Sequence, residues 1–301
     1  MAMDFSRTLV IGISSRALFD LRAENQLYER EGLEAYSAYQ IANEDRVLPP
    51  GAGFPLVRAL LRLNQQMPGE RRVEVIIMSR NSPDISLRLF RSIDHYGLDI
   101  TRAAFVGGAD LTPYLEAFGV GLFLSASEEH VQAAIDAGVP AGLIYDPPAD
   151  LCLTPDQIRI AFDGDAVLFS AESEQIYQTE GLDGFHAHEQ ALAREPLAEG
   201  PFARLLKTLA YLQCETTSEP PPIRTALVTA RGSPAHERVI RTLRAWGVRV
   251  DEVFFLGGMP KHRILKAFGA HIFFDDQDVH CHPASRVVPT ARVPYPRKAE
   301  R

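Results

Sequence analysis

The chain has 301 residues, of which 46% are apolar and 23% charged, the balance of a globular protein with a sizeable core. Its formal net charge of −8 argues against nucleic acid as a partner. A small anionic substrate is compatible with this charge if the site supplies its own positive charge, for which a metal ion is the usual source. No apolar run approaches the ~20 residues that span a bilayer, which argues against a membrane partner.

A repeat with an offset of 150 positions runs through most of the chain. It pairs Leu18 with Leu168, Phe19 with Phe169, Gly107-Gly108 with Gly257-Gly258, and Ala117-Phe118-Gly119 with Ala267-Phe268-Gly269. Because glycine and phenylalanine are uncommon, one constant offset through them indicates an internal duplication. The sequence therefore predicts two homologous domains, residues 1–147 and 152–282, joined by the stretch Asp146-Pro147-Pro148.

Each half alternates short apolar runs, typical of buried parallel strands, with stretches of helical spacing. In the second half we expect strands at residues 158–162, 226–228 and 271–274, and helices at 235–245 and 262–268. Strands that alternate with helices indicate a parallel sheet covered on both faces. The predicted fold class is α/β, with two tandem Rossmann-like domains.

Two segments of the second half lack such patterns. Residues 214–222 contain three consecutive prolines and are predicted to be a loop. Residues 283–301 are rich in proline and arginine and are predicted to form an extended or disordered tail.

The three cysteines, Cys152, Cys214 and Cys281, are scattered and show no CxxC spacing. Such an odd set argues against a disulfide framework and for a reducing compartment. Residues 1–10 lack a basic segment followed by a long apolar run, so we expect no signal peptide and a cytoplasmic location. A homo-oligomer is left open by the sequence.

Polar side chains gather after the predicted strands of the second half, and one lysine precedes a helix. In chain order they are Asp163 and Asp165, Thr229, Ala230 and Arg231, Lys261, and Asp275 and Asp276. In open α/β sheets, functional groups meet beyond the carboxyl ends of the strands. We therefore expect carboxylates, a hydroxyl and an ammonium group to converge there.

Clustered carboxylates repel one another unless a cation lies between them, and Mg²⁺ prefers carboxylate, carbonyl and water oxygens. We expect Mg²⁺ to be bound by Asp163, the backbone of Asp165, and one or both of Asp275 and Asp276. A phosphate ester on that metal would need further donors, which Thr229 and Lys261 can supply.

Three residues carry the remaining roles. Asp163 can attack phosphorus as a covalent nucleophile. Asp165 can protonate the leaving alkoxide and later deprotonate the hydrolytic water. Thr229 and the two residues after it, Ala230 and Arg231, are expected on the substrate side; for Arg231 a structural ion pair is an equal alternative.

This arrangement resembles the haloacid dehalogenase superfamily of aspartyl phosphatases. An apolar strand followed by Asp163 and Asp165 matches its first motif. The second, third and fourth motifs are matched in order by Thr229, Lys261 and Asp275-Asp276. The second aspartate favours phosphoryl transfer over dehalogenation, because only the former needs a leaving-group acid at that position.

A closer resemblance, to the cytosolic 5'-nucleotidase class I family, covers nearly the whole chain. It is carried by residues 14–19 (SSRALF), 161–169 (AFDGDAVLF), 227–231 (LVTAR) and 272–277 (IFFDDQ). It implies hydrolysis of nucleoside 5'-monophosphates with Mg²⁺ in the cytosol, whereas the motifs alone indicate only a phosphatase. The alternatives are a phosphatase of another small phosphate ester and a non-catalytic nucleotide-binding regulatory protein.

The first half lacks the catalytic set, so we predict that it is catalytically degenerate. At the offset of 150, the six motif positions from Asp163 to Asp276 correspond to Ile13, Ser15, Ser79, Leu111, Ser125 and Ala126. Polar residues remain at two of its strand ends, namely Ser14, Ser15, Arg16, Ser79, Arg80 and Asn81. Such a donor-rich, carboxylate-free set suits an anion without a metal, so Arg16 and Asn81 are expected to bind the substrate or a regulatory nucleotide. The alternative is that these residues only cap strand ends and loops.

Overall fold

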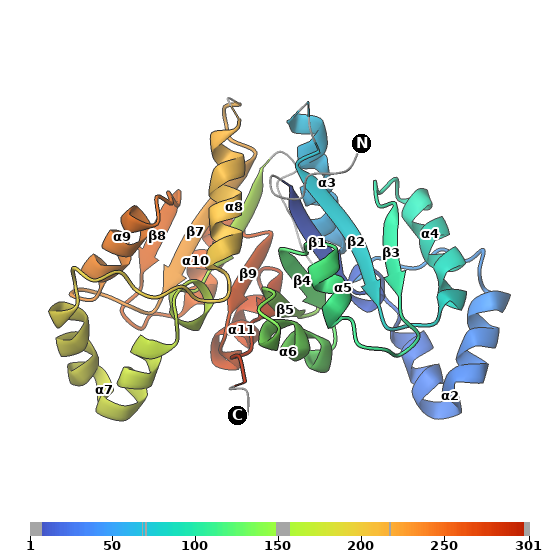
Figure 1. Cartoon of the computed structure of the whole chain (residues 1–301), viewed down its shortest axis with the longest axis horizontal. Helices are drawn as coiled ribbons and strands as arrows, with labels where there is room; N and C mark the ends of the chain where they lie inside the picture. The colour runs from blue at the N-terminus through green and yellow to red at the C-terminus, as the bar shows by residue number, and fades with distance from the viewer. Residues whose placement is uncertain (1–7, 68, 70, 149–156, 217, 298–301) are drawn as a thin grey trace. The chain divides into compact units, whose positions relative to one another are not determined.

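The computed structural model describes residues 8–67, 69, 71–148, 157–216 and 218–297 (Figure 1). Its contacts divide the chain into two compact units, Met1–Ile144 and Tyr145–Arg301. Cys152, where the second domain is predicted to begin, lies outside the described residues.

The first unit is a parallel α/β sheet whose strands lie in the order β3-β2-β1-β4-β5. Its elements are β1 (Leu9–Ile13), α1 (Ser15–Leu18), α2 (Arg22–Ala42), α3 (Phe54–Gln66), β2 (Val73–Ser79), η2 (Pro83–Ile85), α4 (Ser86–His95), β3 (Arg102–Phe105), α5 (Thr112–Ala117), β4 (Leu122–Ser125), α6 (Glu128–Asp136) and β5 (Ala141–Ile144). Strands β1 and β2 are buried along their whole length, as the apolar runs of a central parallel sheet require.

The second unit has the same arrangement, with the strand order β10-β9-β6-β7-β8 and parallel pairing between neighbours. Its elements are β6 (Ile158–Phe162), η3 (Gly164–Leu168), α7 (Glu172–Ala191), α8 (Ala203–Cys214), β7 (Ile223–Thr229), α9 (His236–Ala245), β8 (Glu252–Phe255), α10 (Lys261–Phe268), β9 (Ile272–Asp275), α11 (Asp278–Ser285) and β10 (Thr290–Arg292). The predicted α/β class with a parallel sheet is confirmed.

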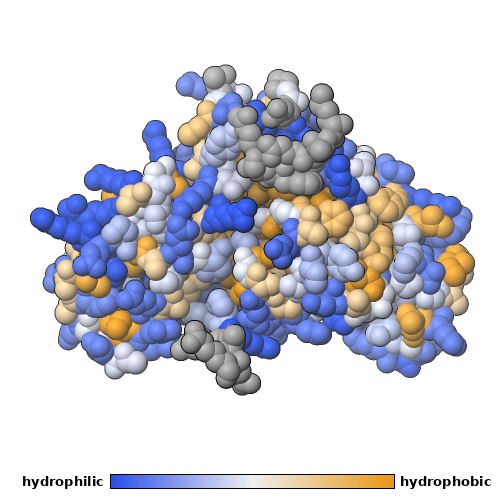
Figure 2. All heavy atoms as spheres, viewed as in Figure 1, coloured by the Kyte–Doolittle hydropathy of each residue, from blue (hydrophilic) through white to orange (hydrophobic). Residues whose placement is uncertain are grey.

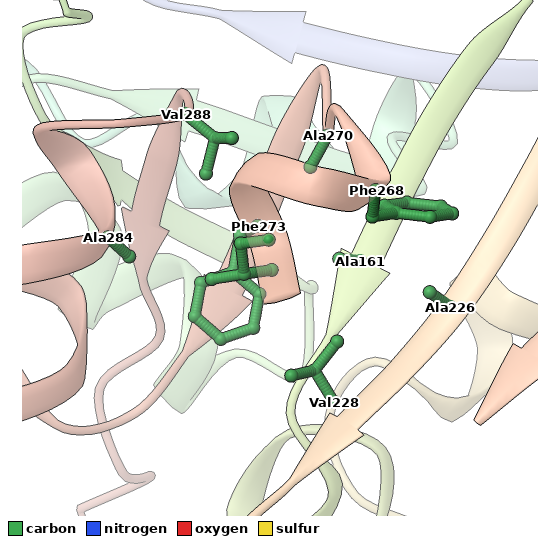
Figure 3. Packing of buried hydrophobic residues seen from close by; sticks show 9 residues of the cluster. Ala161, Ala226, Val228, Phe268, Ala270, Phe273, Ala284 and Val288 are labelled. Atoms are coloured by element: carbon green, nitrogen blue, oxygen red, sulfur yellow. The ribbon is translucent and has the colours of Figure 1, made fainter. Parts of the chain in front are cut away.

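One core of the second unit packs helices α10 and α11 against the sheet. Phe273 of β9 and Phe268 of α10 are buried among small side chains of β6 and β7, including Ala161 and Val228 (Figure 3). Alanines on the strands let the helices approach closely while the two phenylalanines fill the space. This packing holds the carboxyl ends of β6, β7 and β9 in fixed relation to the start of α10.

The prediction of a tail from residue 283 is wrong for the residues described up to 297. Residues 283–285 complete α11, and β10 pairs with β9 in parallel register. Thr290, Ala291 and Val293 are fully buried. The composition misled because the prolines lie beside the strand and inside the helix end, not within the three paired residues of β10.

We expect a chain truncated after Pro289 to be less stable than the full chain, because it loses the ladder to β9 and the buried side chain of Val293. Burying one such side chain contributes about 1.5–3 kcal/mol, so with the lost ladder the unfolding midpoint should fall by roughly 6 °C or more. Differential scanning calorimetry measures this shift. The control is a chain truncated after Arg297, which keeps β10; equal midpoints for the two truncations would contradict the packing described.

The hydrogen bonds also correct the predicted correspondence between the two halves at the first motif. The Asp163 amide donates to the carbonyl of Phe274, and in the first unit it is the Ser14 amide, not that of Ile13, that donates to Leu124 (2.8 and 2.9 Å). The shift arises because η3 contains five residues where α1 contains four. Ser14 therefore takes the position of Asp163, and Arg16 takes that of Asp165 instead of Ser15.

Candidate active site

Three carboxylates meet at the carboxyl ends of β6 and β9. One oxygen each of Asp163, Asp275 and Asp276 lies within 4.8 Å of the others, and all three residues are buried. Asp276 Oδ2 accepts a hydrogen bond from the Tyr295 hydroxyl at 2.5 Å, whereas its Oδ1 is buried with no hydrogen-bond partner. A buried carboxylate oxygen without a donor, beside two other carboxylates, is the setting in which a hard cation binds.

Lys261, the first residue of α10, is the cation that the structure supplies to this cluster. Its Nζ lies 2.7 Å from Asp163 Oδ1 and 2.6 Å from Asp275 Oδ2. Burial opposes the charged form of Lys261, but the two carboxylates outweigh burial and raise its pKa. One ammonium group therefore faces three carboxylates, and the cluster keeps an excess of negative charge.

Burial and the neighbouring charges both shift the pKa values of the acids. Burial, opposed by Lys261 and reinforced by Asp275 and Asp165, raises the pKa of Asp163 to about 7. Burial and the charge of Asp163 likewise raise the pKa of Asp276 to about 7, against the hydrogen bond from Tyr295. A cation placed among these oxygens would lower both values.

Thr229 ends β7 and lies beside the backbone that follows Asp163. Its Oγ1 would be 3.4 Å from a Cβ atom built on Gly164, and it accepts a hydrogen bond from the Arg231 amide at 3.2 Å. The Thr229 hydroxyl is thus oriented next to the first motif. The carbonyl of Ala230 accepts from the Gly258 amide (3.1 Å), which ties the loop after β7 to the loop that leads to α10.

For Arg231 the structure shows the ion pair. Its guanidinium donates to both oxygens of Asp165, with Nε–Oδ2 and Nη2–Oδ1 distances of 2.8 and 2.6 Å. The third arm pairs with Glu189 of α7, and the Arg231 side chain is only 2% exposed. Arg231 therefore fixes the orientation of the Asp165 carboxylate.

Glu189, which is buried and pairs with Arg231, carries no signal in the sequence. Besides Arg231, it accepts from Arg238 of α9 at 2.9 Å and from the Ser173 hydroxyl at 2.8 Å. Two guanidinium groups and a hydroxyl therefore compensate the one buried carboxylate. Glu189 and Tyr295 were missed because each comes from a segment with no motif, and only the fold brings them to the site.

The structure thus brings seven of the predicted side chains to one end of the second unit, those of Asp163, Asp165, Thr229, Arg231, Lys261, Asp275 and Asp276. Arg16 and Asn81 belong to the first unit, where they line a pocket of that unit. In the part of the chain that the structure describes, the group of Asp163, Asp275 and Asp276 is the one cluster of three or more acidic, histidine or cysteine ligands that could hold a metal.

The geometry therefore defines the class of protein: a parallel α/β fold with buried carboxylates and a lysine at the strand ends. The chain matches the family described as 5'-nucleotidase over residues 1–300, and it belongs to that family. It is 39% identical over 300 residues to human "Cytosolic 5'-nucleotidase 1B", covering 96% of this chain and 49% of that protein. The chain therefore spans about half the length of the curated relative it matches.

Two solved structures show weaker likeness. The "Structure of Pnkp1/Rnl/Hen1 complex" covers 97% of this chain and 98% of its own with 13% identity and a TM-score of 0.35. Histidinol dehydrogenase from Elizabethkingia anophelis covers 78% and 48% with 10% identity and a TM-score of 0.22. Neither likeness carries an argument about this chain. Among the described residues, none of the helices has the length and apolar character that crossing a membrane requires.

The raised pKa of Asp163 predicts a linkage between pH, stability and divalent cations. The value of about 7 in the folded chain lies above 3.8, so the folded state retains a proton that the unfolded state loses. Without metal, stability should therefore fall as the pH rises from 3.8 to about 7. A bound cation should cancel this loss, because it binds the ionised carboxylates.

Thermal unfolding with Mg²⁺ or with a chelator, at about pH 5.5 and about pH 8, measures this linkage. We expect the rise in unfolding midpoint caused by Mg²⁺ to roughly double between the two pH values. The control is Asp276→Asn, which should reduce that rise at both. An effect of Mg²⁺ that is independent of pH would contradict the assignment of the cluster.

Proposed function

We propose that this chain hydrolyses nucleoside 5'-monophosphates to a nucleoside and phosphate in the cytoplasm, with Mg²⁺ and a covalent aspartyl-phosphate intermediate on Asp163. The observation that carries the proposal is the buried cluster of Asp163, Asp275 and Asp276 with Lys261 inside it, in a chain of the 5'-nucleotidase family. The name of the human relative supports the substrate and the location.

Asp163, Asp275 and Asp276, together with the backbone carbonyl of Asp165, would hold the Mg²⁺. The fit rests on the three converging oxygens and on the buried, unpartnered Oδ1 of Asp276. When bound, the ion neutralises the charge of the transferring phosphoryl group and of the acids around it.

The chain's own residues perform the transfer in two steps. In the first, an oxygen of Asp163 bonds to phosphorus, the bond to the 5'-oxygen breaks, and Asp165 gives that oxygen its proton. In the second, Asp165 takes a proton from water, whose oxygen bonds to phosphorus and releases Asp163 and inorganic phosphate. Lys261 orients Asp163 throughout, and the Thr229 hydroxyl donates to a phosphoryl oxygen.

Arg231 acts through Asp165 as a positioning residue. Its bidentate pair holds the Asp165 carboxylate in one orientation, as proton delivery to the leaving oxygen requires. Glu189 in turn holds Arg231, so the orientation of the acid depends on a buried group on α7.

We further infer that the two units arose by tandem duplication of a haloacid dehalogenase-type domain and that the first has lost the chemistry. Equal strand order and matching hydrogen bonds support this, among them the amides of Asn81 and Arg231, which donate to Ser79 and Thr229 at 3.2 Å each. The first unit carries Ser14, Ser125 and Leu111 where the second carries Asp163, Asp275 and Lys261.

The function is tested by a phosphate-release screen over nucleoside 5'-monophosphates and sugar phosphates, with Mg²⁺ and with a chelator. We expect turnover of the nucleotides only with Mg²⁺, its near-complete loss in Asp163→Asn because an amide is no nucleophile, and a loss of roughly 10²-fold in Asp165→Asn. Asp183→Asn, at an exposed aspartate of α7, is the matched control.

Full turnover in Asp163→Asn would overturn the mechanism. A preference for sugar phosphates would favour the alternative of another small phosphate ester. Binding of nucleotides without any turnover would favour a non-catalytic nucleotide-binding protein.

The role of Arg231 is tested by Arg231→Gln, with Arg231→Lys as the conservative variant. Loss of the bidentate pair leaves the Asp165 carboxylate free to rotate away from the leaving group, so kcat should fall by roughly 10-fold or more with little change in KM. Turnover at pH 7 should fall, with partial recovery in the lysine variant. An unchanged kcat with a lowered unfolding midpoint would show that Arg231 serves stability alone.

A further inference from the structure

A pocket of about 410 Å³ lies at the carboxyl ends of the strands of the first unit. Ser14 and Ser15 follow β1, Ser79 and Asn81 lie at the end of β2, and Ser125 ends β4. Its volume lies within the range of small-molecule sites. The mechanism proposed above uses no residue of this pocket.

The charge of the pocket is positive, in a chain whose net charge is −8. Among the residues that line it, Glu129 is the one carboxylate; its side chain is 78% exposed and pairs with Arg80. Arg16 lines the pocket and, within the described residues, has no carboxylate at salt-bridge distance. Burial, with Arg80 and Arg16 nearby, lowers the pKa of His130, so the imidazole adds no charge at neutral pH.

The polar side chains that follow β1 and β2 supply the pocket with hydrogen-bond donors. Ser15 Oγ lies 3.1 Å from Ser79 Oγ and accepts from Asn81 Nδ2 at 3.1 Å, while Ser79 Oγ accepts from the Asn81 amide at 3.2 Å. One of the two hydroxyl protons joins the two serines, and the other is left to donate. An anion bound in the pocket can accept this remaining proton.

Helix α2 contributes aromatic and aliphatic side chains to the pocket. It bends at Gly32 (φ 83°), as does α7 at Gly181 (φ 70°), and each is seen as two segments at an angle (Figure 1). Tyr28 and Tyr36, with ring centroids 5.9 Å apart, line the pocket together with Leu33. Tyr28 and Leu33 are 49% and 57% exposed, and hydrophobic surface is visible over α2 (Figure 2).

We propose that the first unit binds a nucleotide in this pocket without a metal ion, as a site separate from the Asp163 centre. The phosphate lies against Arg16, Asn81 and the serine hydroxyls, and the base packs on Tyr28 and Leu33. A phosphate and an aromatic ring on one ligand match the two ends of the pocket, and the lack of carboxylates at the strand ends removes the need for a cation.

The test is isothermal titration calorimetry of the full chain in a chelator. Under these conditions the carboxylate cluster of the second unit repels phosphate, and only the proposed pocket is expected to bind it. The probes are inorganic phosphate, adenosine, and the adenosine mono-, di- and triphosphates. We expect each phosphorylated nucleoside to bind more tightly than phosphate or adenosine alone.

Two variants separate the ends of the ligand. Arg16→Ala should weaken both phosphate and nucleotide binding by roughly 10-fold or more, since it removes a charge-assisted contact. Tyr28→Ala should weaken nucleotide but not phosphate. Arg58→Ala, at an exposed arginine of α3 outside the pocket, is the matched control and should change neither.

The series of adenosine phosphates separates two sources of the ligand. Tightest binding of the monophosphate identifies a further molecule of the substrate, and tightest binding of a longer phosphate identifies a different nucleotide. No binding in chelator, or binding unchanged by Arg16→Ala, overturns the proposal. Because this assay needs no turnover, its failure is distinct from a failure of the proposed phosphatase activity.

Discussion

The contact of Lys261 with Asp163 and Asp275 is the interaction on which the rest of the second unit depends. All three side chains are buried, and a buried charge is tolerated only when it is paired. One ammonium group cannot balance three carboxylates. The cluster is therefore built with a deficit of positive charge, and burial, together with the charges of Asp275 and Asp165, keeps the pKa of Asp163 raised before a further cation binds.

The first unit has the same strand order as the second but a different set of charges at its strand ends. Where the strand ends carry serines in place of Asp163 and Asp275, no lysine is needed, and the corresponding position is the buried Leu111. Replacing carboxylates by hydroxyls removes both the reason to bind a cation and the repulsion of an anion. Under the proposed duplication, the loss of catalysis and the proposed anion pocket would be two results of one set of substitutions.

The parts of the site that could be predicted from the sequence are those that depend on local order. Asp163, Thr229 and Asp275 each follow an apolar run, and parallel strands bring their carboxyl ends to one edge. The partners of these residues could not be predicted in this way. Tyr295 reaches Asp276 from a segment whose proline content indicated a tail, and Glu189 lies on a helix whose mostly exposed, polar sequence gave no sign of a buried acid.

The correspondence between the halves shows a further limit of pattern matching. A constant offset of 150 aligns the glycines and phenylalanines but places Asp163 opposite Ile13, because the extra residue in η3 means that the offset is only 149 before it, between β1 and β6. Only the hydrogen bonds to Phe274 and Leu124 show that Ser14 takes this position.

That extra residue has a physical consequence for the backbone beside Asp165. In η3 the chain passes through Ala166 at φ 60°, a left-handed conformation that costs a non-glycine residue roughly 1–3 kcal/mol. Ala166 is 5% exposed, and the turn closes through the Phe169 amide, which donates to the Gly164 carbonyl at 2.9 Å, so the surrounding structure enforces the conformation.

Asp165 lies directly before this strained residue, with extended backbone angles (φ −69°, ψ 139°), and Arg231 pairs with its side chain. In the first unit, α1 makes the shorter turn without a left-handed residue, and the position of the acid is occupied by Arg16. The strained turn thus accompanies Asp165, and the turn without a left-handed residue accompanies Arg16.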